Sequence, residues 1–180
     1  MRITISGSPG TGTTTLGRAL AEKYQYRYLS AGEVFRSFAK ECGMDLAMFG
    51  ERAKEDPKID LDIDARQKEI GESSDNIILE GRLAGWMVEN ADLKILLSAS
   101  PECRAERIAV RENISVDEAY AATLEREACE AERYMQYYEI EIGDISPYDL
   151  VISSETFDQA SLFAVVDAAI SQVLAKKKEQ

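Results

Sequence analysis

The chain has 180 residues, 45% of them hydrophobic, which is the size of one compact domain that can bury a substantial core. Its 33 acidic and 21 basic residues give a formal net charge of -12, which repels nucleic-acid backbones and anionic membrane surfaces. Histidine is absent and the three cysteines lie far apart, which argues against a zinc site and a disulfide framework. No apolar run approaches a membrane span, and we expect a cytoplasmic protein.

Residues 3–5 predict a short first strand, and a glycine-rich loop and a helical pattern follow it. The loop consists of Gly7, Ser8, Pro9, Gly10, Thr11, Gly12, Thr13, Thr14 and Thr15. Strand, loop and helix in this order are the context of a phosphate-binding P-loop, and Gly7, Gly12 and Thr14 match its pattern. Thr13 replaces the usual lysine. Backbone N–H groups and the helix dipole still favour phosphate, and Thr14 offers a hydroxyl to Mg²⁺.

Further β-type runs occur at residues 26–29, 76–79, 93–97 and 150–152, with helical patterns between them. Runs of this length without polar alternation are typical of strands covered on both faces. The intervening helices can make the right-handed crossovers of a parallel sheet. The fold class is therefore α/β.

Helix starts are marked by capping signals near residues 101, 115 and 157. Ser100 precedes Pro101, and capping boxes are expected at residues 115–118 and 156–159. We expect the last helix to run to the lysines at 176–178, whose solvated charges favour a helix C-terminus. Residues 45–73 lack β-type runs and are rich in charge, so we expect helices that form a flap beside the sheet.

Two sets of arginines are spaced along consecutive predicted helices. Arg104, Arg107 and Arg111 follow an i, i+3, i+7 pattern on the helix from residue 101, which places them on one face. On an isolated helix, a solvated stripe paired with neighbouring glutamates is the slightly favoured interpretation. The next helix repeats the pattern at residues 126, 130 and 133 with Arg, Glu and Arg. Two arginine faces joined by a short turn predict a helical hairpin that closes over the phosphate loop as a lid.

Together with residues 29–36 (LSAGEVFR) and 79–87 (LEGRLAGWM), these motifs resemble the archaeal-type cytidylate kinases, in the nucleoside monophosphate kinase group of P-loop NTPases. The resemblance extends over almost the whole chain. It implies one domain, residues 1–180, with the three-layer P-loop NTPase fold around a central parallel sheet. It also implies a helical flap for the nucleoside monophosphate at about 30–73 and a helical lid at about 104–138.

The resemblance assigns roles to individual residues. It implies that Ser30 and Arg36 hold the acceptor nucleotide, and that Arg82 after the third strand binds substrate. Its lid signature matches Arg126, Glu130 and Arg133, whose arginines would clasp the transferring phosphoryl group while the acid orients them. Arg104, Arg107 and Arg111 would be the donor-side lid positions.

The acidic segment at 57–67 also resembles the part of the family that closes over the acceptor. For each of Asp60, Asp62 and Asp64 taken singly, a solvated charged face is the favoured interpretation over a base-binding group. Cytosine offers an amino donor beside two acceptors, so its pocket needs a carboxylate or carbonyl next to an arginine or amide. Arg82 with an acid from this segment would suffice. Trp86 could stack on a base, although a lone tryptophan after a strand is more often part of the core.

We therefore expect an enzyme that transfers the γ-phosphoryl group of ATP to CMP and dCMP, with Mg²⁺ held by Thr14 and a water-bridged acid such as Glu80. One alternative is a small kinase of the same fold that acts on AMP, UMP or a hydroxylated metabolite such as shikimate. Another is a non-catalytic nucleotide-binding regulator, suggested by Thr13. We expect small-molecule partners and a monomer, and neither polynucleotide nor membrane binding.

Overall fold

A computed structural model describes residues 1–179, except for the side chains of residues 46, 47 and 54. In this part of the chain one parallel sheet has the strand order β2-β3-β1-β4-β5. The strands are β1 (Arg2–Gly7), β2 (Arg27–Ser30), β3 (Ile77–Glu80), β4 (Leu93–Ser98) and β5 (Leu150–Ser153). Each predicted strand is confirmed with small shifts at its ends. The predicted α/β class and parallel sheet are confirmed as well.

The helices between the strands supply the crossovers of the parallel sheet. They are α1 (Thr13–Tyr24), α2 (Ala31–Glu41), α3 (Leu46–Glu55), α4 (Pro57–Ser73), α5 (Ala84–Met87), α6 (Pro101–Glu112), α7 (Val116–Tyr138) and α8 (Gln159–Lys178). Helices α3 and α4 occupy the charged stretch that was predicted to be helical. No helix among residues 1–179 is both long and apolar enough to cross a membrane.

Two hydrophobic cores cover the two faces of the sheet. On one face, α1 and α8 pack on β1, β4 and β5, with Ile3, Leu20 and Val166 fully buried. On the other face, α2, α4 and α5 pack on β2 and β3. Along β3, Ile78 belongs to the first core while Ile77 and Leu79 belong to the second. This alternation shows why the buried strands carry continuous apolar runs.

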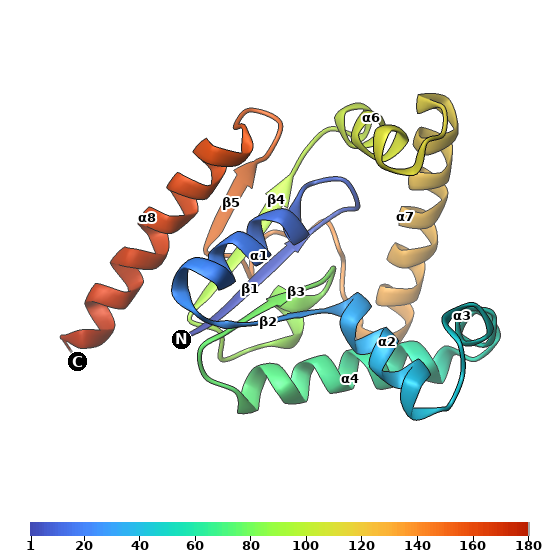
Figure 1. Cartoon of the computed structure of the whole chain (residues 1–180), viewed down its shortest axis with the longest axis horizontal. Coiled ribbons are helices and arrows are strands. Elements are labelled where there is room, and N and C mark those ends of the chain that lie inside the picture. The colour runs from blue at the N-terminus through green and yellow to red at the C-terminus, as the bar shows by residue number, and fades with distance from the viewer. Residues whose placement is uncertain (180) are drawn as a thin grey trace.

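Helices α2, α3, α6 and α7 lie beyond the carboxyl ends of the strands, on the right-hand side of Figure 1. Helices α6 and α7 form the predicted helical hairpin and pack on each other through Ala105, Ile108 and Ala119. In a parallel α/β sheet, the carboxyl ends of the strands are where ligands bind. The two helical groups therefore flank the expected binding edge.

Two of the three predicted helix starts are confirmed by their caps. The Ser100 hydroxyl accepts from the Cys103 N–H at 3.2 Å, and Ser115 forms a capping box with Glu118. The third start lies two residues later than predicted, and its predicted cap is wrong, because α8 begins after Asp158, whose carboxylate accepts from the Ser161 N–H at 2.8 Å. The Thr156 hydroxyl that was expected to cap this helix donates to Ser153 Oγ instead. Helix α8 ends at Lys178, as expected.

Candidate active site

The glycine-rich loop joins β1 to α1 in a conformation that depends on its glycines. Gly12 is the N-cap of α1 with φ of 90°, a backbone conformation that L side chains rarely adopt. A Cβ on Gly7 would lie 2.5 Å from Thr11 Oγ1 and 2.9 Å from the Leu97 carbonyl oxygen. No side chain caps the start of α1, so its first N–H groups are available to an anion.

The loop threonines are hydrogen-bonded to an acid at the end of the neighbouring strand. Thr13 Oγ1 donates to Glu80 Oε1 at 2.7 Å, and Tyr28 donates to Glu80 Oε2 at 3.1 Å. Thr14 Oγ1 lies 3.5 Å from the same Oε2. Burial and the nearby Glu80 charge raise the pKa of Tyr28 to about 12, which keeps its hydroxyl protonated as a donor. The residue in place of the P-loop lysine is thus turned toward Glu80.

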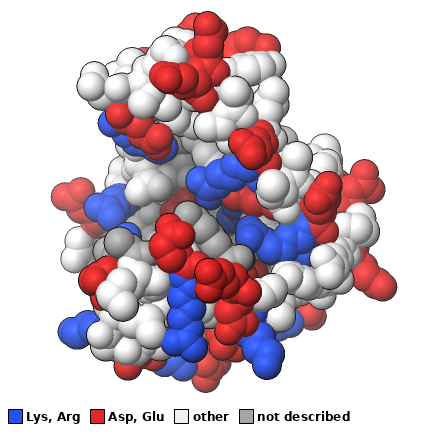
Figure 2. All heavy atoms as spheres, turned by 90° about the vertical axis from the view of Figure 1, so that its right-hand side faces the viewer, with Lys and Arg blue, Asp and Glu red and all other residues white. Residues whose placement is uncertain are grey.

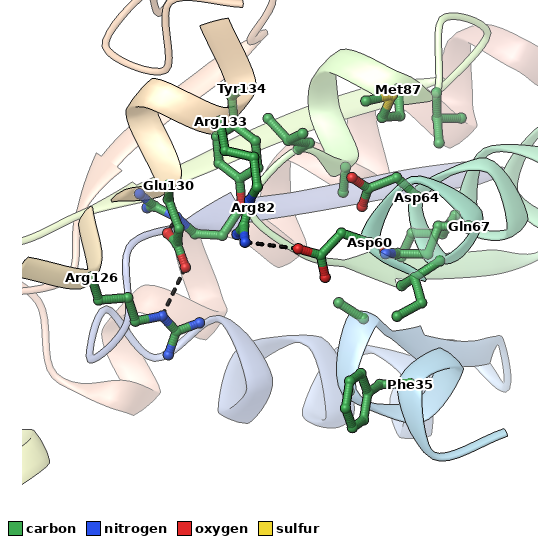
Figure 3. Close-up of a pocket in the computed structure, with 17 residues that line it drawn as sticks. Phe35, Asp60, Asp64, Gln67, Arg82, Met87, Arg126, Glu130, Arg133 and Tyr134 are labelled. Atoms are coloured by element: carbon green, nitrogen blue, oxygen red, sulfur yellow. Dashed lines mark hydrogen bonds and ion pairs between the residues drawn. The ribbon is translucent and has the colours of Figure 1, made fainter. Parts of the chain in front are cut away.

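Arg82, two residues beyond β3, links the loop to α7. Its Nη1 donates to Ser8 Oγ at 2.7 Å, and its Nε donates to Glu130 Oε2 at 2.7 Å. The other oxygen of Glu130 accepts from Arg126 Nε, also at 2.7 Å. The Glu130 side chain is only 6% exposed, so this carboxylate is enclosed between two guanidinium groups (Figure 3). The acid of the lid signature therefore orients arginines from two separate elements.

Arg133 reaches across to the helices on the other side of the site. Its Nη1 lies 2.7 Å from Asp60 Oδ2 on α4, as the dashed line in Figure 3 shows. One turn further along α7, the Tyr138 hydroxyl donates to Asp64 Oδ2 at 2.8 Å. Helices α7 and α4 are therefore joined by two polar contacts.

The arginines of α6 do not share one environment. Arg104 is 4% exposed, and its two Nη atoms donate to the Glu127 carboxylate of α7 at 2.9 and 3.0 Å. Arg107 Nη1 donates to the Gly10 carbonyl oxygen in the loop at 3.2 Å and its Nη2 to the Ser154 carbonyl oxygen at 2.7 Å, whereas Arg111 pairs with Glu112. Burial raises the pKa of Glu127, but hydrogen bonds from Ser8 and Arg104 outweigh it and hold the pKa below its ordinary value.

Two cavities adjoin at the carboxyl edge of the sheet. The larger, about 1310 Å³, is lined by the glycine-rich loop, Glu80 and the α6 arginines Arg107 and Arg111. The smaller, about 280 Å³, is lined by residues of α2, α4, α5 and α7. Arg82 and Arg126 line both cavities. Figure 2 shows basic side chains gathered around a hollow on this face of an otherwise acidic molecule. Two adjoining cavities with shared arginines suit two phosphorylated ligands whose phosphates meet.

Three further residues that the sequence offers as substrate contacts are Ser30, Arg36 and Trp86, and they lie in different surroundings from one another. Ser30 is buried and caps α2, where its hydroxyl accepts from the Glu33 N–H. Arg36 does not line either cavity, but its Nη1 lies near Gly32, which lines both. Trp86 packs against the core around Leu83 and Tyr134, the alternative to base stacking. Sequence reasoning missed Tyr28, Glu127 and Tyr138, because no motif points to any of the three.

The strand order, the loop after the first strand and the paired cavities define the class of P-loop kinases. Solved structures agree with this class. A gluconokinase from Sinorhizobium meliloti superposes with a TM-score of 0.63 at 14% identity, covering 99% of this chain and 96% of its own. A shikimate kinase from Bacteroides thetaiotaomicron gives 0.60 at 16% identity, covering 96% and 98%. At these identities the likeness shows the fold alone.

Within that class, residues 2–156 match the model of the cytidylate kinase-like family. A protein named cytidylate kinase from Methanocorpusculum labreanum is 72% identical over 98% of this chain and 100% of its own length. Another of that name, from Pyrococcus abyssi, is 48% identical over 97% and 96%. The chain belongs to the cytidylate kinase-like family and is a nucleoside monophosphate kinase, a phosphotransferase, which confirms the resemblance seen in the sequence.

Proposed function

We propose that this chain transfers the γ-phosphoryl group of ATP to CMP, giving ADP and CDP, and that it accepts dCMP as well. The observation that carries the proposal is the pair of cavities that meet at Arg82 and Arg126, one against the phosphate loop and one between α4 and α7. The names of relatives at 72% and 48% identity support cytidylate as the acceptor.

The larger cavity is the proposed ATP site. The backbone N–H groups of Gly7 to Thr15 and the N-terminus of α1 would cradle the donor phosphates. Thr14 and Glu80 fit a magnesium ion, because hydroxyl and carboxylate oxygens are its preferred ligands and the two lie 3.5 Å apart at the loop. Mg²⁺ bound there would neutralise charge on the outer phosphates. Thr14 would hold it directly and Glu80 through water.

Catalysis would be mainly electrostatic. Arg126 and Arg133 on α7, together with Arg82, would stabilise the charge that develops on the transferring phosphoryl group. Glu130 holds Arg82 and Arg126 in position before substrate arrives. The attacking atom is a phosphate oxygen of CMP, so no strong general base is needed, which agrees with the absence of histidine.

We propose that α6 and α7 act as a lid and that α2 to α4 act as the flap over the acceptor. The contact of Arg107 with the loop at Gly10 supports a role on the donor side. Arg104 would support transfer from its enclosed position by holding α7 against the loop through Glu127. Ser30 and Arg36 would close the acceptor side at the start of α2. Closing these elements would exclude water and protect ATP from hydrolysis.

The experiment that tests the function measures ADP release from ATP and Mg²⁺ in a coupled assay with CMP, dCMP, UMP, AMP or GMP, against a blank without acceptor. Strong acceleration by CMP and dCMP is expected. Preference for another acceptor would overturn the choice of cytidylate but leave the kinase. No acceleration by any of them, with ATP still bound, would favour a non-catalytic regulator, which Thr13 and the acidic surface suggest.

A further inference from the structure

A half-buried carboxylate in the smaller cavity has no cation of its own. Asp64, on α4, lines this cavity, and its Oδ2 accepts from the Tyr138 hydroxyl at 2.8 Å. Within the described residues, no Lys or Arg nitrogen lies within 4.0 Å of Asp64, whereas Asp60, one turn earlier, is paired with Arg133 at 2.7 Å. Burial raises the pKa of Asp64 to about 6. Keeping such a carboxylate in a cleft lowers stability, so its presence indicates a function.

An unpaired amide lies beside this carboxylate. Gln67 follows Asp64 by three residues on α4, so the two side chains share one face of the helix. Gln67 is 8% exposed and lines the same cavity, yet its amide makes no hydrogen bond to any described residue. A Cβ added to Gly81 would lie 3.1 Å from the Gln67 Oε1, so this oxygen faces the Gly81 backbone. Figure 3 shows the Gln67 amide nitrogen on the side of Asp60. Gln67 therefore presents a donor to the cavity.

The other charged side chains of this cavity are already paired with one another. Arg82 and Arg126 share Glu130, and Arg133 holds Asp60. The remaining walls are apolar and suit the faces of a planar ring. They come from Phe35, Ile63, Leu79, Met87 and Val88. Asp64 thus offers an acceptor oxygen, and Gln67 an amide donor, that no described residue engages. Both groups lie next to an apolar slot.

The Asp64 carboxylate and the Gln67 amide together complement the hydrogen-bonding edge of cytosine. Cytosine presents an amino donor at C4 next to the N3 acceptor, whereas uracil presents an acceptor at C4 next to an N3–H donor. A carboxylate acceptor beside an amide N–H donor complements the cytosine edge. Against the uracil edge the same pair sets acceptor against acceptor and donor against donor. A buried charge that would face the uracil carbonyl oxygen rejects it strongly, because that oxygen cannot donate a hydrogen bond.

We propose that Asp64 and Gln67 determine the specificity for cytosine, with Asp64 accepting from the 4-amino group and Gln67 donating to N3. The inference rests on the proposed function and names the residues that select its acceptor. Arg82, which the sequence suggested as a partner of the base, is committed to Ser8 and Glu130 and serves the phosphates instead.

The test compares the wild type with Asp64→Asn, which can turn an N–H donor toward uracil. Steady-state kcat/KM is measured for CMP, UMP and the monophosphate of 2-pyrimidinone ribonucleoside, which lacks the amino group. A hydrogen bond to a charged group accounts for about ten- to hundred-fold in such a ratio. We expect Asp64→Asn to lower kcat/KM for CMP by about that factor and to raise the ratio of UMP to CMP, with the KM for ATP unchanged.

The 2-pyrimidinone nucleotide separates recognition from a structural role. The wild type should have a lower kcat/KM for the 2-pyrimidinone nucleotide than for CMP. With the 2-pyrimidinone nucleotide, Asp64→Asn should lower kcat/KM little further. The effects of the mutation and of the missing amino group are then not additive. Asp62→Asn, an exposed aspartate on the same helix, is the matched control and should behave as wild type. Gln67→Glu, which replaces the donor by a carboxylate, should also lower kcat/KM for CMP.

Equal losses of CMP and UMP turnover in Asp64→Asn, or additive losses with the 2-pyrimidinone nucleotide, would overturn the inference. Circular dichroism and thermal melting show whether each variant folds, and calorimetric titration with CMP and UMP in the absence of ATP gives the same comparison without turnover. A wild type that does not prefer CMP would refute the proposed function itself. A wild type that prefers CMP, with Asp64→Asn keeping that preference, would refute only the assignment to Asp64.

Discussion

The hydroxyl of Thr13 donates a 2.7 Å hydrogen bond to Glu80, so the position that carries lysine in most P-loops here holds the acid at the end of β3. Tyr28 donates to the second oxygen of the same carboxylate. A lysine at this position would meet a carboxylate within contact distance. Thr13 and Tyr28 together fix the orientation of Glu80 beside Thr14, where magnesium is proposed to bind.

Substitutions of Thr13 should therefore affect the magnesium dependence. Thr13→Val removes the donor to Glu80 and is expected to lower kcat and to raise the Mg²⁺ concentration needed for half-maximal rate. Thr13→Ser retains the donor and should leave both quantities unchanged. The measurement is a titration of ADP release with MgCl₂ at saturating nucleotide. A Thr13→Val enzyme with the wild-type magnesium dependence would contradict this role.

Thr13→Lys should not behave as a restored P-loop. Its ammonium would lie beside Glu80 and form an ion pair there, which competes with phosphate for the lysine and with water-bridged Mg²⁺ for the acid. We expect a rate similar to or below that of the wild type, measured in the same assay. A large gain in kcat would show instead that the wild type lacks a charge that the reaction needs.

Removing the α7 arginines should slow the reaction strongly. Arg126→Ala or Arg133→Ala is expected to lower kcat by about one to three decades, the size of single transition-state contacts. Arg133→Ala also frees Asp60 and should raise the KM for CMP. Arg27, exposed on edge strand β2, supplies the control Arg27→Ala. Unchanged turnover in both α7 variants would contradict the lid assignment.

The enclosed pair of Arg104 and Glu127 should matter for stability. Glu127→Ala leaves the buried guanidinium without its carboxylate and is expected to lower the free energy of unfolding by about 3 kcal/mol, measured by urea denaturation. Glu125 is an exposed neighbour on α7, and Glu125→Ala should change the free energy by less than about 0.5 kcal/mol. Similar midpoints for the two variants would contradict a structural role for the pair.

The raised pKa of Asp64 predicts a pH-dependent stability. Burial raises this pKa from 3.8 to about 6, although the Tyr138 hydroxyl and the charge of Arg133 oppose the shift, and Asp60 adds to it. Tyr134 also faces Asp64 from α7. A carboxyl with a raised pKa favours the folded state while it is protonated, so its stabilisation is full below about pH 4 and is lost as the pH rises through 6.

Asp64→Asn should therefore be as stable as the wild type near pH 4 and more stable above pH 6, by at most about 3 kcal/mol. Urea denaturation of both proteins between pH 4 and 8, without nucleotide, measures the difference. The exposed control Asp62→Asn should change the free energy of unfolding by less than about 0.5 kcal/mol. Equal stabilities of wild type and Asp64→Asn at pH 8 would show that the carboxylate is not destabilising in the free protein.

Local pattern was sufficient for the strands, for the phosphate loop and for the helix starts at Pro101 and Val116, because each depends on residues within a few positions of one another. The P-loop match and the lid spacing pointed to the site for the same reason. The cap of α8 was predicted wrongly, since Thr156 and Asp158 are both capable caps and their surroundings select Asp158.

The partners within the site depend on packing between elements far apart in the chain. Arg104, Arg107 and Arg111 share a spacing, but the rotation of α6 against α7 encloses Arg104 with Glu127 and leaves Arg107 at the loop. Tyr138 reaches Asp64 across 74 positions, and Thr13 reaches Glu80 across 67. Such pairs form only when the sheet and its helices are assembled, because their geometry is set by crossing angles and burial that no local spacing encodes.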